Sequence, residues 1–139
     1  MALLPDLSIS PEKVCFIAGK ARQYDAKDAV TEPNPASNAS DDSMWAVLED
    51  HADDPVRREL ADFIWGLNED EQIDLVTLAW LGRGDGDLGD WPALREEALR
   101  AHNARTGTYL LGMPLLASYL ESALSLFGLS CETIEADHR

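Results

Sequence analysis

The sequence is poor in basic residues, and this shortage excludes two classes of partner. Lysine and arginine total 11 against 26 aspartates and glutamates, so the 139 residues carry a formal charge of −15. Nucleic-acid phosphates and anionic membrane surfaces repel a chain of this charge. We therefore expect neither nucleic acid nor a membrane among its partners. The acidity leaves open mimicry of DNA by carboxylates, although excess acid is commonly only a solvated surface.

Cysteine is also scarce. Cys15 lies in an apolar run and Cys131 lies beside a polar tail, and their spacing fits no metal motif. These positions predict that Cys15 packs as a small buried hydrophobe and that no disulfide framework forms. The N-terminus lacks the basic region and the apolar run of a secretory signal. Together these features predict a reducing, cytoplasmic location.

The sequence also lacks an apolar run long enough to cross a membrane. From Gly107 to Cys131 the only charged residue is Glu121. Gly112 and Pro114 interrupt this stretch, however, and leave about 14 helical residues where about 20 are needed. We therefore reject a membrane span and interpret the stretch as part of a folded domain.

No segment alternates with the period of a strand, whereas helix signals are frequent. Ser10 and Pro11 open a first helix that should run to about Lys27. Residues 30–43 contain two prolines and several polar residues, which predicts a surface linker. A short helix from Met44 to Ala52 should follow it.

The second half of the chain contains the strongest helix signals. Asp54 and Pro55 open a helix whose apolar stripe comprises Leu60, Phe63, Ile64 and Leu67. Asn68 and Glu71 form a capping box before residues 73–81, which are apolar nearly all round. We expect this helix at the centre of the fold, with Trp80 buried.

Two more helices should complete the chain, at about 91–111 and 113–127, separated by Gly112 and Pro114 and ended by Gly128. Gly82 or Gly84 should end the preceding helix. These elements predict an all-α fold, a single compact domain of five or six helices over residues 1–139, with a polar tail from about 129.

Several strings in the sequence resemble a known bacterial family. They are SPEKVCFI at 10–17, LNEDEQ at 67–72, LAWLGRGD at 78–85, HNART at 102–106 and YLLGMPLL at 109–116. Over about residues 8–127 the chain is similar to the domain of unknown function DUF3775. The resemblance implies a bacterial cytoplasmic protein and brings no reaction, cofactor or catalytic residue. Gly86 and Gly89 depart from the bulkier or acidic residues expected in the acidic loop.

The acidic loop from Asp85 to Asp90 is the first candidate site. With Asp85 as position one of a calcium loop, Asp87 and Glu96 take positions three and twelve, as in an EF-hand. The match fails at positions five, six and eight, which hold glycine, aspartate and proline. We therefore expect carboxylates that cap the next helix, with a cation site as the alternative.

The second candidate lies on the predicted helix 91–111. Extending its apolar stripe from Leu94 and Ala98 leads to His102 and Arg105, so polar side chains stand where apolar ones are expected. One interpretation is that both are buried and paired inside the fold. The other is a small pocket in which His102 acts as a general base or metal ligand and Arg105 binds an anion.

The third candidate is a surface on the last helix, formed by Ser118, Glu121, Ser122 and Ser125. This face is small and nearly neutral in a strongly acidic chain, so another protein could approach it without strong repulsion. An ordinary exposed, serine-rich face is the alternative.

The leading interpretation is a protein-interaction or regulatory module whose partner is another protein or a second copy of the chain. The alternative is a small enzyme or a metal- or anion-binding protein centred on His102 and Arg105 or on the acidic loop. The sequence indicates no cofactor and assigns no catalytic residue.

Overall fold

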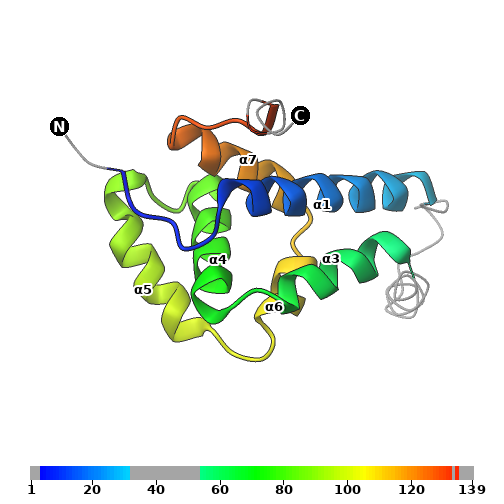
Figure 1. Cartoon of the computed structure of the whole chain (residues 1–139), viewed down its shortest axis with the longest axis horizontal. Helices are drawn as coiled ribbons and strands as arrows, with labels where there is room; N and C mark the ends of the chain where they lie inside the picture. The colour runs from blue at the N-terminus through cyan, green and yellow to red at the C-terminus, as the bar shows by residue number, and fades with distance from the viewer. Residues whose placement is uncertain (1–3, 32–53, 133, 135–139) are drawn as a thin grey trace, which may run out of the picture.

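The computed structural model describes residues 4–31, 54–132 and 134, and this part of the chain is helical without strands (Figure 1). The predicted all-α fold is confirmed. Most of the predicted linker and the predicted helix from Met44 to Ala52 lie outside the described residues. The helices are α1 (Pro11–Thr31), α3 (Pro55–Trp65), α4 (Glu69–Arg83), α5 (Trp91–Ala101), α6 (Thr106–Leu111) and α7 (Leu116–Leu126), with a 3₁₀ turn, η2 (Leu88–Asp90), before α5.

Helix α4 lies at the centre, as its all-round apolar sequence predicts. It packs on α7 and α5, while α1 lies across α7 and α3. In Figure 1, α4 stands upright between α5 on one side and α3 on the other. Ile73, Leu75 and Leu78 on α4 are at most 1 % exposed. Gly82 allows α4 and α7 to approach each other closely, because a Cβ at this position would overlap the backbone carbonyl of Tyr119 on α7.

The ends of α3 and α4 follow the predicted capping residues, but the start of α5 does not, because the side chain of Asp90 makes no capping hydrogen bond to α5. The side chain of Asp54 accepts hydrogen bonds from the first turn of α3, and Asn68 and Glu71 form the capping box that opens α4. Gly84 ends α4 with a φ of +99°, and Gly128 follows α7 with a φ of +77°. Both conformations favour glycine, because side chains rarely adopt a positive φ.

Two carboxylates on α4 hold other segments against it. Asp74 is fully buried and accepts hydrogen bonds from the backbone N–H of Ser8 and from Arg95 Nε, the second at 2.7 Å. This hydrogen bond raises the pKa of the Arg95 guanidinium above its usual value. Glu71 binds Lys13 Nζ at 2.6 Å, and this contact and the Asn68 N–H hold the pKa of Glu71 below its usual value. The start of α1 and the middle of α5 are thus tied to α4.

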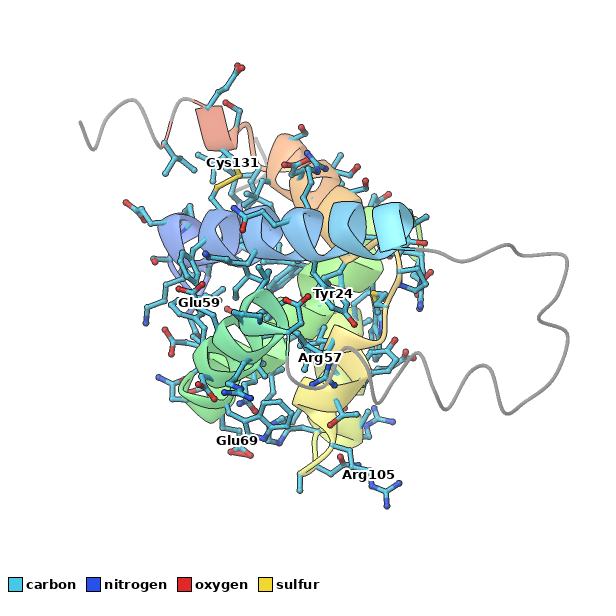
Figure 2. All side chains as sticks on the ribbon, turned by 90° about the vertical axis from the view of Figure 1, so that its right-hand side faces the viewer. Tyr24, Arg57, Glu59, Glu69, Arg105 and Cys131 are labelled. Carbon is cyan, nitrogen blue, oxygen red and sulfur yellow. A yellow bond between two sulfur atoms is a disulfide. The ribbon has the colours of Figure 1, made fainter. Side chains whose placement is uncertain are left out.

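The predicted absence of a disulfide is wrong, because Cys15 on α1 is bonded to Cys131 after α7, with their Cα atoms 5.5 Å apart. Figure 2 shows this bond where the C-terminal segment crosses α1. Cys15 is indeed buried. The contact brings together residues 116 positions apart, which sequence spacing does not reveal. Closing such a loop stabilises the fold by about 4 to 5 kcal/mol in the chain-entropy account.

Two helix predictions also need correction. The expected helix 91–111 is two helices, because the chain leaves α5 after Ala101 and starts α6 at Thr106. In addition, α1 continues past the predicted end near Lys27 to Thr31.

The prediction that Trp80 is buried at the centre is wrong. Trp80 lies in the last turn of α4 and is only partly buried, because its side chain faces the space beside α5 and α6. Among the described tryptophans the buried indole is that of Trp91, which is 4 % exposed and packs edge-on against Phe127 with ring centroids 5.6 Å apart.

The first prediction concerns the buried carboxylate of α4. Replacing Asp74 with alanine should lower the free energy of unfolding by about 3 kcal/mol, because it removes the acceptor of a buried backbone N–H and of Arg95. Urea denaturation followed by circular dichroism measures the change. Asp70→Ala is the matched control: it removes the more exposed partner of Arg95, 3.3 Å away, and should cost less than about 0.5 kcal/mol. Equal losses of unfolding free energy in Asp74→Ala and Asp70→Ala would contradict the role assigned to Asp74.

Candidate functional site

A pocket of about 290 Å³ opens where α4, α5 and α6 meet. It is lined by Val76, Trp80, Ala98, Ala101, His102, Asn103, Arg105, Thr106 and Tyr109. The second candidate of the sequence, His102 and Arg105, therefore lies at a pocket, although the two residues belong to a corner between helices. The break between α5 and α6 forms one side of it.

Local hydrogen bonds shape this corner. The side-chain oxygen of Asn103 accepts from the backbone N–H of Arg105 at 2.7 Å, and the Thr106 hydroxyl oxygen accepts from the N–H of Asn103 at 3.1 Å. These are short polar side chains that satisfy nearby backbone groups outside a helix. They explain why a sequence with helical apolar spacing turns here instead of continuing.

His102 lies against the start of α4. Its Nε2 lies 2.8 Å from Oε1 of Gln72, whose own amide nitrogen donates to the carbonyl of Ile64. This orientation of the amide assigns Nε2 of His102 as a donor. Nδ1 lies 3.4 Å from Oε1 of Glu69. The imidazole therefore joins the end of α5 to α4 through its Nε2–H, and Nδ1 binds the Glu69 carboxylate only when the ring is protonated.

A tryptophan and a tyrosine form another wall of the pocket. The indole Nε1–H of Trp80 donates to the hydroxyl of Tyr109 at 2.9 Å. Arg83 lies beside the same hydroxyl and forms a two-pronged ion pair with Asp85, which raises the pKa of Arg83 and lowers that of Asp85. The polar edge of Trp80 is thus occupied, and its ring contributes apolar surface.

Arg105 is exposed, so the interpretation that it is buried and paired is wrong. Its guanidinium contacts no carboxylate of the described residues. Figure 2 shows the side chain extending away from the body of the molecule, at the end opposite Cys131. The helix break explains the outcome, since Arg105 leaves the apolar stripe that it was expected to continue.

The carboxylates of the acidic loop, and that of Glu96 after it, bind groups that lie within four residues along the chain. Asp85 binds Arg83, and Glu96 binds Arg100 one turn later on α5 at 2.9 Å. Asp87 caps the 3₁₀ turn: its side chain accepts from the Gly89 N–H, and Asp90 accepts from the Asp87 N–H. Across the described ranges no three His, Cys, Asp or Glu side chains gather into a group that could hold a metal ion.

The predicted face on the last helix is divided in the structure. Ser118 and Ser122 are exposed, and the exposed side chains of Leu115 and Leu126 lie on the same side at helical spacing. We call these four residues, Leu115, Ser118, Ser122 and Leu126, the α7 outer face.

Glu121 and Ser125 lie at the edge of this face, in a shallow hollow beside Arg22 of α1 and the C-terminal segment. The guanidinium of Arg22 binds both carboxylate oxygens of Glu121, at 2.7 and 3.2 Å. The only charge of the predicted face is therefore paired.

Comparison with known families supplies the identification. A family model described as "Protein of unknown function (DUF3775)" matches residues 57–129, which include the whole pocket and α7. The chain belongs to this family. No curated protein and no solved structure gave a match. The match confirms the family suggested by the sequence strings, and it leaves both cysteines of this DUF3775 chain outside the matched range.

Among the described residues of the DUF3775 chain, no helix combines the length and the apolar character needed to cross a membrane.

The sequence pattern identifies His102 and Arg105 but not the walls of the pocket. Ala98 and Ala101 leave space because their side chains are small, and the apolar run that contains Trp80 predicts a core position for it. The missed signal was local: Asn103 and Thr106 are residue types that favour helix boundaries, and they stand inside the apolar pattern.

The second prediction separates the two residues of this corner. Arg105→Ala should change the free energy of unfolding by less than about 0.5 kcal/mol, because the side chain is exposed and lacks a described partner. His102→Ala should cost about 1 to 2 kcal/mol, because it removes the bridge to Gln72 and Glu69. Chemical denaturation of both variants provides the comparison. A larger loss from Arg105→Ala than from His102→Ala would reverse the assignment.

Proposed function

We propose that this DUF3775 chain is a bacterial protein-interaction or regulatory module that binds its partner through the α7 outer face. One observation carries the proposal. Two leucines, Leu115 and Leu126, are 54 and 47 % exposed at the ends of a surface whose middle consists of serines. These two leucines, on a face without charge, supply apolar area that a partner could bury.

The charge distribution supports the same surface. The chain carries a net charge of −15, so most of its surface repels a second acidic protein. The α7 outer face has no charged member, and Arg22 pairs Glu121 at its edge. A partner placed on this face avoids the like-charge contacts that are costly elsewhere.

The small side chains also allow a close approach. Ser118 and Ser122 lie between the two leucines, so the backbone of a partner helix could come near α7 while leucine side chains pack on either side. In this arrangement Leu115 and Leu126 supply most of the apolar area, and the serine hydroxyls remain able to hydrogen-bond across the contact.

The size of the face defines what else must take part. The 11 residues of α7 span about 16 Å, which is too short for a specific interface of roughly 1,200 to 2,000 Å². Because α7 packs mainly on α4 and α1, the adjoining surface of α1 is placed to enlarge the contact.

A second copy of the chain is the first partner to test. In a symmetric dimer the α7 outer face would meet itself, and both copies would bring a neutral surface. A different protein with a matching apolar helix is the second partner, and both belong to the same function.

The third prediction tests this face by charge insertion. Ser122→Arg should weaken self-association at least about tenfold, because it places an unpaired charge in the middle of the contact. Sedimentation velocity of the wild type and the variant measures the dissociation constant. Thr108→Arg on α6 adds the same charge elsewhere and should leave the constant unchanged.

Two results decide between the partners. A wild type that remains monomeric at about 100 μM would exclude the homodimer, because a specific dimer has a dissociation constant well below this concentration. In that case wild-type and Ser122→Arg baits are compared in affinity capture from the source bacterium. Identical captured proteins would overturn the α7 outer face as the contact surface.

Cytoplasmic location remains part of the proposal, and the disulfide makes it testable. Glutathione and thioredoxin keep most cytoplasmic thiols reduced, and disulfides found there are usually transient or redox-sensing. The fourth prediction is that rapid alkylation of living cells traps a substantial reduced fraction of Cys15 and Cys131, measured by mass spectrometry. Complete oxidation of both residues would instead place the protein in an oxidising compartment.

A further inference from the structure

We infer that the pocket between α4, α5 and α6 binds a small apolar or aromatic carboxylic acid. The apolar part would lie between Trp80 and the alanines of α5, and the carboxylate would lie at the corner formed by Asn103, Arg105 and Thr106. This inference does not depend on the α7 outer face, which lies on another helix.

The walls account for the apolar part of the ligand. Val76, Ala98 and Ala101 contribute only aliphatic carbon to the lining. The indole nitrogen of Trp80 is already bonded to Tyr109, so Trp80 contributes the surface of its ring. A pocket of about 290 Å³ is at the lower end of the range for small-molecule sites and suits one ring or a short aliphatic chain.

The corner accounts for the carboxylate, because its uncommitted groups are donors. The Asn103 carbonyl oxygen and the Thr106 hydroxyl oxygen already accept backbone hydrogen bonds. The amide N–H groups of Asn103 and the hydroxyl proton of Thr106 therefore remain for an incoming acceptor. Arg105 also lines the pocket, and its exposed guanidinium, which extends away from the body of the molecule (Figure 2), is not paired with a carboxylate of the described chain and would turn back over the corner to bind the ligand. Two donors at the corner and an adjacent cation favour an anionic oxygen ligand.

The remaining polar side chains of the pocket offer no unpaired cation. His102 is turned toward Gln72 and Glu69, and the Tyr109 hydroxyl, which accepts from Trp80, keeps one proton to donate. Arg83, the other cation near the pocket, is neutralised by Asp85. Arg105 is thus the group that distinguishes a carboxylate from a neutral ligand of the same shape.

Three probes of one shape test the chemistry: 3-phenylpropionate, 3-phenylpropan-1-ol and 3-phenylpropylamine. Each is titrated into the full-length, ¹⁵N-labelled protein while the Trp80 indole N–H is followed by NMR. The acid should bind with a dissociation constant between about 10 μM and 1 mM and at least about fivefold more tightly than the alcohol. The amine should bind more weakly than either.

Variants then assign the two halves of the site. Arg105→Gln should reduce acid binding to the level of the alcohol, while alcohol binding stays the same. Arg100→Gln is the matched control, because it removes the same charge from an exposed residue that does not line the pocket. Ala101→Leu should weaken the acid and the alcohol alike by filling the pocket from an exposed position. Circular dichroism confirms that each variant is folded.

Each contrary result overturns a defined part of the inference. If none of the probes shifts the Trp80 signal, the pocket is not a site for this class of ligand. Equal binding of acid and alcohol to the wild type would exclude carboxylate recognition. Equal losses of acid binding in Arg105→Gln and Arg100→Gln would show that the loss comes from the net charge of the protein and not from a contact made by Arg105. None of these results bears on self-association, which the Ser122→Arg experiment tests separately.

Discussion

The fold depends on one buried carboxylate, that of Asp74. It is fully buried in the central helix, and it receives the backbone N–H of Ser8 from one side and Arg95 from the other. Burying a charge is costly unless it is paired and hydrogen-bonded, and here both conditions are met. The N-terminal segment, α4 and α5 are therefore fixed relative to one another at a single point. Since α5 carries one wall of the pocket, the position of the candidate site follows from this interaction.

Glu71 extends the same arrangement by one helical turn. It completes the capping box with Asn68 and binds Lys13 at the start of α1. One residue thus satisfies the beginning of its own helix and orients a neighbouring helix. His102 binds α4 at nearly the same level, through its hydrogen bond to Gln72. The first two turns of α4 consequently act as the attachment site for α1 and for the corner beside the pocket.

Much of this architecture was predictable because it depends on neighbours in the sequence. Capping by Asp54 and Asn68, the end of α4 at Gly84 and the central place of α4 all follow from local patterns. The roles of Asp74 and Cys131 do not, because each depends on a residue more than 20 positions away. The same limit applies to the candidate site.

At the candidate site, helical spacing assigns a side chain to a face only while the helix continues. His102 and Arg105 interrupt an apolar pattern that predicts one continuous helix. The chain leaves α5 after Ala101, so this pattern does not predict the exposed position of Arg105. Helical spacing also places the serines of the last helix together. Their division between an outer face and a hollow depends on Arg22, which lies 99 positions before Glu121.

The disulfide gives the chain a closed covalent topology. Because Cys15 and Cys131 are joined, the intervening backbone forms a ring that contains every residue matched by the family model, 57–129. A protease that cuts this ring once opens it without releasing a fragment. The two pieces remain one covalent molecule and separate only when a reductant is added. Resistance to fragmentation by a single cut is therefore a property of the oxidised chain, whatever the strength of its packing.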